Sequence, residues 1–320
     1  MDTKLAQNDS SHAMFNVAPG VWGKRHLFVN FYVIQNFDAG TWILVDAGLK
    51  SSAGQIKQLA TSLFGENSKP AAIVLTHGHF DHVGALKTLL EEWDVPVYAH
   101  ELEMPYLTGK SSYPPPDPSV GGGLMASFSF LFPSEPIDIE ENVKPIPFNE
   151  KISELPGWKF IHTPGHSPGH ISLFREQDKV LIAGDAFVTT KAESLLSTIL
   201  QKEEISGPPK YFTCNWASAK LSVLKLAALQ PETVATGHGR VMRGASMREE
   251  LEVFSRNFDQ TALPETGRYT DEPAVANENG VLWIPKKTES VPAALKVMTL
   301  GAIGIALGLV VYQQLKKQVT

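Results

Sequence analysis

Residues 77–82 have the pattern His-x-His-x-Asp-His, which places four side chains of metal-binding type within six positions. A helix or a strand turns successive side chains in different directions, so neither can aim all four at one point. A tight loop can, and Gly78 and Gly84 are expected to give its backbone the freedom that it needs. An apolar run, 71–76, precedes the pattern and a helical pattern follows at 83–93, so we expect a loop between a strand and a helix. A His-rich tract can also be a solvated surface segment, and the rest of the chain decides between the two readings.

Three further segments repeat this design, since each is a short apolar strand followed by a turn of small residues with one metal-binding side chain. The candidate metal ligands of all four segments are His77, His79, Asp81, His82, His166, Asp185 and His238. Five imidazoles and two carboxylates suffice for two metal ions with open coordination positions, rather than for one closed structural site. Nitrogen and oxygen ligands suit two zinc ions best, while iron and manganese are also compatible.

In this order the segments resemble the metallo-β-lactamase fold superfamily, and within it the glyoxalase II-like and lactonase-like hydrolases. The resemblance extends over roughly residues 15–260 and includes the sequence Thr-Pro-Gly-His-Ser-Pro-Gly-His at 163–170. It implies an α/β (α+β) fold, an αββα sandwich with the site at one edge, where strand ends meet. It also implies that one metal ion is bound by His77, His79 and His166, that the other is bound by Asp81, His82 and His238, and that Asp185 bridges them.

The resemblance further implies hydrolysis of an ester, a thioester or a lactone. We hypothesise that a hydroxide bridging the two ions attacks the carbonyl carbon, because coordination lowers the pKa of water toward ~7. Asp81 is the candidate catalytic residue, since it can orient the hydroxide and accept its proton. The arginine and lysine carriers of a glutathione group cannot be identified, and Phe187 stands where lactonases have a tyrosine. Two alternatives stay open, an iron-dependent oxidoreductase resembling the persulfide dioxygenases and a phosphodiester hydrolase.

Other polar residues are expected in supporting roles. Asp46 ends an apolar strand, and the resemblance gives this position a structural role close to the site rather than a direct one. His170 lies four residues after His166, but the intervening proline and glycine exclude a helical pair, so we expect it to be structural. His100 and His162 belong to strands and are expected to be packing or surface residues.

The composition is that of a globular protein with one large domain and additional segments, with 320 residues, 43% of them hydrophobic and 19% charged. A net charge of −6 argues against a nucleic-acid partner, so a small-molecule substrate is expected. The composition does not indicate an oligomeric state, either monomeric or assembled. The one cysteine, Cys214, excludes an intrachain disulfide. The first twelve residues are polar, so we expect no secretory signal and a cytoplasmic catalytic domain.

Apolar periodicity predicts strands near 15–22, 26–35 and 41–46, and helices near 51–64, 215–229 and 246–260. Ser246 with Glu249 three residues later is a capping box, which predicts where the last helix begins. The expected parts of the chain are a polar tail at 1–14, a hydrolase domain at 15–261 and a linker at 262–290. Within the domain, residues 110–137 are rich in proline and glycine but also hold several aromatic side chains. This segment is predicted either to be a lid on the substrate pocket or to cover the sheet edge.

The carboxyl-terminal part holds sixteen uncharged residues at 297–312, with lysines on either side. A membrane helix needs about 20 apolar residues, and fewer where flanking lysines reach the interface. Gly304 and Gly308 have a spacing at which membrane helices pack. We therefore expect an apolar transmembrane helix at 291–315 that attaches the catalytic domain to a membrane. The alternative is a terminal helix buried on the domain or in a dimer.

Overall fold

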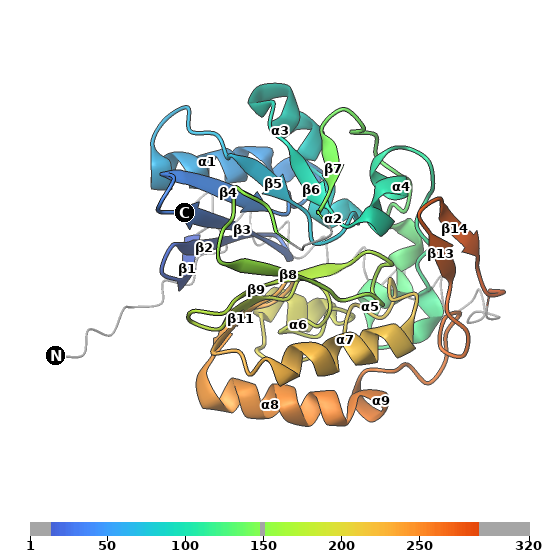
Figure 1. The fold of residues 1–320 in the computed structure, drawn as a ribbon. Coiled ribbons are helices and arrows are strands. Elements are labelled where there is room, and N and C mark those ends of the chain that lie inside the picture. Colours follow the sequence, from blue (N-terminus) through green and yellow to red (C-terminus); the bar gives the residue numbers. More distant parts are fainter. Residues whose placement is uncertain (1–13, 148–150, 288–320) are drawn as a thin grey trace, which may run out of the picture. The chain divides into compact units, whose positions relative to one another are not determined.

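Two mixed β-sheets form the centre of the fold, and the computed structural model describes them within residues 14–147 and 151–287 (Figure 1). The first sheet has seven described strands, in spatial order β1 (Met14–Ala18), β2 (Val21–His26), β3 (Val29–Asn36), β4 (Thr41–Val45), β5 (Ala72–Val74), β6 (Val97–Ala99) and β7 (Val143–Pro145). The second has five, in spatial order β12 (Met242–Arg243), β11 (Thr233–Ala235), β10 (Val180–Ile182), β9 (Ile171–Arg175) and β8 (Trp158–His162).

The first sheet changes from antiparallel to parallel pairing at β4. Short turns join β1 to β4, and these strands pair antiparallel. The chain then crosses over through α1 (Ala53–Phe64) to β5, and through α2 (Phe80–Val83) and α3 (Leu86–Trp93) to β6, and both new pairs are parallel. Parallel pairing brings the carboxyl ends of β4 and β5 to the same edge of the sheet, where open α/β sheets form their binding sites.

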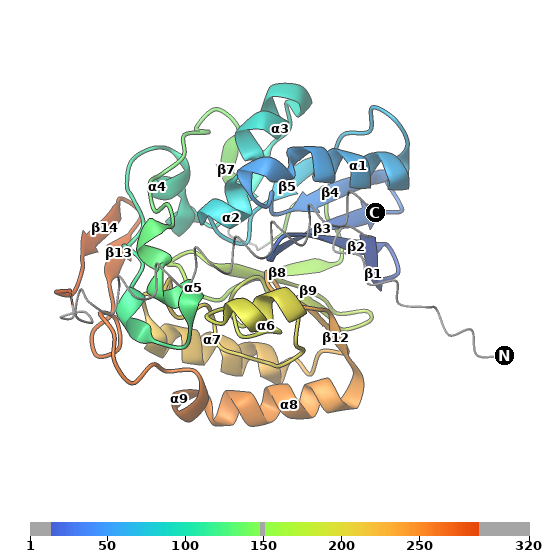
Figure 2. The ribbon, with the colours of Figure 1, turned by 180° about the vertical axis from the view of Figure 1, so that it is seen from behind.

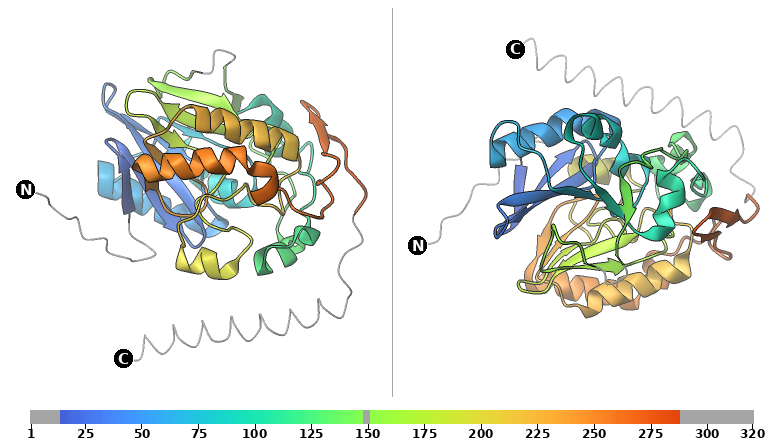
Figure 3. Two further views of the ribbon diagram at one scale, coloured as in Figure 1. Left: turned by 90° about the horizontal axis from the view of Figure 1, so that it is seen from below. Right: turned by 45° about the horizontal axis from the view of Figure 1, so that its top comes forward.

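Helices cover the outer face of each sheet, which gives four layers in the order α-β-β-α (Figures 1 and 2). On α3 the side chains of Leu86, Leu89 and Trp93 are buried, and they follow the helical period and face the first sheet. The second sheet is covered by α7 (Trp216–Ala228) and α8 (Gly244–Arg256), which run side by side in Figure 3. Apolar side chains fill the space between the two sheets and the space between each sheet and its helices. The predicted αββα sandwich is confirmed.

Four short helices and a two-stranded hairpin complete the α-helices and β-strands that the structure describes. They are α4 (Met104–Leu107), α5 (Leu124–Ser127), α6 (Leu195–Leu200), α9 (Phe258–Thr261) and the hairpin of β13 (Val275–Asn277) with β14 (Gly280–Trp283). The segment expected as a linker makes ordered contacts as far as it is described. Tyr269 is 3% exposed and its hydroxyl donates to the carbonyl of Pro115 at 2.7 Å, so residues after 262 hold the 110–137 segment in place.

The predicted transmembrane helix at 291–315 lies outside the described residues, as does almost all of the polar tail at 1–14. Among the residues that the structure does describe, no helix is both long and apolar enough to cross a membrane. The prediction of membrane attachment is therefore corrected and is not carried further.

Candidate metal centre

All seven predicted ligands come together between the two sheets. Each follows the carboxyl end of a strand, and the strands are β5, β8, β10 and β11. Two of the seven, Asp81 and His82, lie on the first turn of α2, as the strand-to-helix pattern predicted. All seven are buried, with exposed fractions from 0% for His77 to 5% for Asp81.

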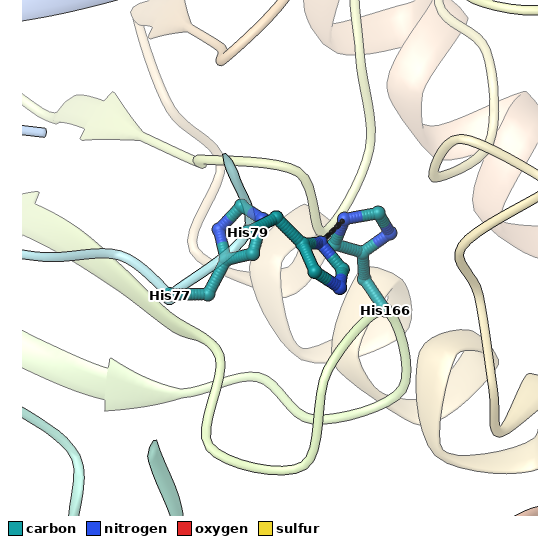
Figure 4. A group of neighbouring side chains, drawn as sticks. All are labelled: His77, His79 and His166. Carbon is teal, nitrogen blue, oxygen red and sulfur yellow. Dashed lines mark hydrogen bonds between the residues drawn. The ribbon is translucent and has the colours of Figure 1, made fainter. Parts of the chain in front are cut away.

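The ligand atoms form three groups in which all atoms lie within 4.8 Å of one another. The groups are His77 with His79 and His166, His77 with His82 and Asp185, and Asp81 with His82 and His238. The first and the third share no residue, and the second joins them. Figure 4 shows the first group, in which the Nδ1 atom of His79 is 3.0 Å from the Nε2 atom of His166.

Asp185 lies between the first and third groups. Its Oδ2 atom is 3.5 Å from Nε2 of His166, 3.6 Å from Nε2 of His82 and 3.1 Å from Nε2 of His238. Gly237 makes this position available, because an added Cβ atom there would lie 2.0 Å from Oδ1 of Asp185. One carboxylate thus faces imidazoles of both groups.

Close approach, not backbone freedom, explains the glycines of the first loop. Gly78 has no positive φ, and Gly84 has the helical φ of −57°. An added Cβ atom would lie 2.6 Å from the Tyr113 hydroxyl at Gly78 and 2.3 Å from the backbone nitrogen of Lys50 at Gly84. The glycines were singled out correctly from the sequence, but for the wrong reason.

Asp46 orients His82 by contacting the ring nitrogen that does not face Asp185. Its carboxylate accepts hydrogen bonds from the backbone nitrogen of Thr76 at 2.7 Å and from the Thr76 hydroxyl at 2.8 Å, and it contacts Nδ1 of His82 at 2.9 Å. A proton on Nδ1 of His82 then leaves its Nε2 atom unprotonated, with a lone pair that can bind a metal ion. Asp46 belongs to none of the three groups, which agrees with the structural role expected for it.

His170 holds the backbone next to Asp185. The backbone nitrogen of Asp185 donates to Nε2 of His170 at 2.9 Å, so the imidazole proton is on Nδ1 and faces the Thr163 hydroxyl at 2.8 Å. His100 and His162 stack at 4.0 Å between ring centroids, and neither belongs to a metal group.

The residues present fit metal ions. Within the described part of the chain, three buried atoms of the centre make no hydrogen bond, namely Nε2 of His77, Nε2 of His82 and Oδ1 of Asp185. A buried polar atom without a partner costs free energy unless something else satisfies it. Unpartnered nitrogen and oxygen atoms that face one another in this way match the ligand preferences of zinc, iron and manganese.

The electrostatics of the two outer groups differ. Burial, followed by the charge of neighbouring histidines, lowers the pKa of His77 and His166 well below its usual value and that of His79 to about 3. These imidazoles are therefore neutral, which is the form that binds metal. In the other group burial would lower the pKa of His82, but Asp185 and Asp46 outweigh it and raise the value. Carboxylates here attract positive charge, whether it comes as protons or as a metal ion.

Sequence reasoning missed an aromatic wall beside the first group. The Phe212 ring stacks on His79 at 4.5 Å, and Phe132 lies 6.0 Å from Phe212 and 5.6 Å from Phe80. Phe132 comes from the 110–137 segment, whose Val120 and Ala126 are buried in the same cluster. The aromatic content of that segment was the available signal, but nothing in the sequence marked Phe212.

Comparisons with known proteins agree with this geometry. A family model described as "Metallo-beta-lactamase superfamily" matches residues 25–238. A protein of Bacillus subtilis (strain 168) named "Probable metallo-hydrolase YflN" is 48% identical over 242 residues, which cover 75% of this chain and 92% of that protein. "Hydroxyacylglutathione hydrolase GloC" of Haemophilus influenzae is 28% identical over 142 residues, 44% of this chain and 60% of that protein. Among solved structures, a beta-lactamase domain protein from Burkholderia ambifaria has a TM-score of 0.53 at 21% identity, with 78% of each chain covered, and it shows the fold alone.

Proposed function

The chain belongs to the metallo-beta-lactamase superfamily and is a metal-dependent hydrolase, and we propose that it cleaves an ester, a thioester or a lactone with two divalent metal ions. The observation that carries the proposal is the position of Asp185. Its Oδ2 atom lies within 3.6 Å of Nε2 atoms from two groups that share no residue. A carboxylate in that place offsets the repulsion between two neighbouring cations.

In this proposal each outer group holds one ion. His77, His79 and His166 would hold the first, Asp81, His82 and His238 would hold the second, and Asp185 would supply a carboxylate to both. Zinc suits these ligands best, and iron and manganese remain compatible. When bound, the ions would supply a hydroxide nucleophile at neutral pH and a Lewis acid for the carbonyl oxygen.

Asp81 is proposed as the general base. Burial raises the pKa of its carboxyl, and the neighbouring His82 and His238 oppose that rise. Its Oδ2 atom lies 3.5 Å from Nε2 of His238, so the carboxylate is held within the site. From there it orients the attacking group and accepts its proton.

The 110–137 segment is proposed as a lid. Phe132 of this segment packs against Phe212, which stacks on His79, and Tyr113 of the segment lies 4.5 Å from His79 between ring centroids. The segment therefore contacts the centre and not only the sheet edge. Such a wall excludes water and favours a substrate with an apolar group next to its carbonyl. The printed name of one relative, hydroxyacylglutathione hydrolase, supports acyl-group hydrolysis as the reaction.

A substrate panel tests the proposal. The metal-loaded protein is assayed with an aryl ester, an acyl thioester, a lactone with an apolar chain, a β-lactam and a phosphodiester. We expect hydrolysis of at least one of the first three, abolished by a chelator and restored by zinc. Turnover of the phosphodiester alone, or oxygen consumption by an iron-loaded protein without any hydrolysis, would contradict the proposal and favour one of the two alternatives.

A further inference from the structure

A buried carboxylate lies beside the ligand loops and belongs to none of the three metal groups. This residue is Glu103, the last residue of the 3-10 helix η2 (Glu101–Glu103), and it is 0% exposed. No motif surrounds it in the sequence, and the proposed reaction does not use it. Burying a carboxylate is costly unless hydrogen bonds satisfy it, so its partners indicate what it does.

Four donors satisfy the two carboxylate oxygens. Oε2 accepts from the backbone nitrogen of Gly78 at 2.9 Å and from the Tyr113 hydroxyl. Oε1 accepts from the Ser167 hydroxyl at 2.8 Å and from the backbone nitrogen of Gly169 at 2.7 Å. An ionised carboxylate has about four acceptor positions, and here each oxygen receives two donors. A neutral amide in the same place would turn a donor of its own toward two of them.

Three of the four donors belong to the loops that carry the first metal group, and the fourth, Tyr113, belongs to the 110–137 segment. Gly78 lies between His77 and His79, and Ser167 follows His166 directly. Glu103 therefore ties the loop after β5 to the loop after β8 with one side chain. No other described side chain is seen to bond backbone nitrogens of both loops.

The loops approach this carboxylate as closely as glycine allows. An added Cβ atom at Gly169 would lie 2.8 Å from both Cγ and the backbone nitrogen of Glu103. At Gly78 it would lie 2.6 Å from the Tyr113 hydroxyl, which itself bonds to Glu103. Tyr113 is fixed in turn by stacking on Tyr106 at 3.9 Å. Tyr113 is thus held on both sides, by Glu103 and by Tyr106.

We propose that Glu103 is a positioning residue, which sets the spacing between the two loops so that His77, His79 and His166 converge on one metal ion. The inference rests on the proposed function in that these histidines bind metal. It adds a specific claim, namely that the affinity of this group depends on a carboxylate that never touches the ion. Residues that hydrogen-bond directly to metal ligands typically contribute 10- to 100-fold to metal affinity, and we expect an effect of this size from Glu103 through the ligand loops.

The test compares metal binding by wild type and Glu103→Gln. Affinity for Zn²⁺ is measured by competition with a chelator of known affinity, and the Co²⁺-loaded protein gives a visible spectrum that reports the ligand arrangement. We expect the Glu103→Gln variant to bind its tighter ion about 10- to 100-fold more weakly and to have an altered Co²⁺ spectrum. Glu103→Asp keeps the charge but cannot reach both loops, so it should be weakened as well.

Glu250→Gln is the matched control, because Glu250 also accepts a backbone hydrogen bond, from Ile205 at 2.7 Å, but contacts neither ligand loop. It should leave affinity and spectrum unchanged. If Glu103→Gln only lowers the melting temperature of the metal-free protein, with wild-type affinity and spectrum, Glu103 is structural and the inference fails. It also fails if Glu103→Asp restores wild-type affinity.

A milder variant covers the case in which Glu103→Gln does not fold. Ser167→Ala removes one donor from Oε1 and should weaken the same ion by about fivefold, the usual effect of one hydrogen bond. Wild-type affinity in Ser167→Ala would then count against the inference. Because every readout is metal binding, an inactive but metal-binding protein would refute the hydrolase proposal and leave this inference standing.

Discussion

Replacing Asp185 by asparagine should remove one of the two metal ions. The substitution keeps the shape of the side chain but removes its charge, while its Oδ2 atom faces Nε2 atoms at 3.1 Å and 3.5 Å in the two outer groups. Two unit charges about 3.5 Å apart attract each other by about 5 kcal/mol at an effective dielectric constant near 20. The amide oxygen of asparagine can still bind metal, and this binding recovers part of the lost attraction. We therefore expect the weaker ion to lose about 3 kcal/mol, or roughly 150-fold in affinity.

Titration of the metal-free variant with Zn²⁺ in the presence of a chelator measures the loss of metal affinity. The rate of hydrolysis of the best substrate should fall by at least the same factor. Asp178→Asn is the control, because Asp178 is an aspartate of a turn that pairs with Arg175 at 2.8 Å and not with the centre. Two tight ions and full hydrolysis in Asp185→Asn would refute the bridging role. If Asp185→Asn loses its cooperative unfolding, Asp185→Glu is used in its place; it keeps the charge but moves the carboxylate, so weaker binding of at least one ion is expected.

Three further substitutions test separate features of the protein, namely the metal centre, the lid and a partly buried histidine pair. Gly237→Ala should lose an ion, because its Cβ atom would lie 2.0 Å from the Asp185 carboxylate, whereas Gly54→Ala on α1, with open space around it, should keep both by elemental analysis. Phe132→Ala should raise KM by about tenfold in steady-state assays without changing metal content, and an unchanged KM would contradict the lid. Burial, and after it the charge of His162, lowers the pKa of His100 to about 4, so folding favours the neutral imidazole. The contribution of His100 to the free energy of unfolding is therefore fully present above pH 6.5 and is lost as the pH decreases toward 4. Urea midpoints across that range should fall less steeply in His100→Gln than in wild type, and identical slopes would show that His100 is not involved.

The candidate metal ligands could be singled out from the sequence because the information is local. Each ligand follows a short apolar strand, and a turn of small residues right after a strand places its side chain at the end of a sheet. Asp185 and His238 are separated by more than fifty residues, yet β10 and β11 pair in parallel, so their turns lie at one edge. The αββα order followed from the same alternation of strands and helices.

The start of α8 was predicted incorrectly because a tertiary contact overrides the capping signal. The helix begins at Gly244, two residues before Ser246, and no side chain caps it. β12 pairs with β11 up to Arg243, and the backbone nitrogen of Gly244 donates to the carbonyl of Glu232 at 2.9 Å. The strand thus leads directly into the helix and leaves no place for a cap at Ser246.

The roles of Glu103 and Phe212 could not be predicted from the sequence, for a different reason. Both act through residues distant in the chain, since Glu103 contacts Gly169 across 66 positions and Phe212 stacks on a histidine in the first loop. Neither has a pattern of neighbours that distinguishes it from an ordinary loop residue. Long-range hydrogen bonds and ring contacts of this kind become visible only when the fold is known.

The metal content of the purified protein tests the central claim most directly. The full chain, prepared without chelator and supplied with zinc, is analysed for elemental stoichiometry beside Asp81→Ala and His82→Ala. The account predicts two ions per wild-type chain and one in each variant, because both substitutions remove residues proposed to hold the second ion and leave those proposed to hold the first. One ion per chain in wild type, unchanged by either substitution, would contradict it.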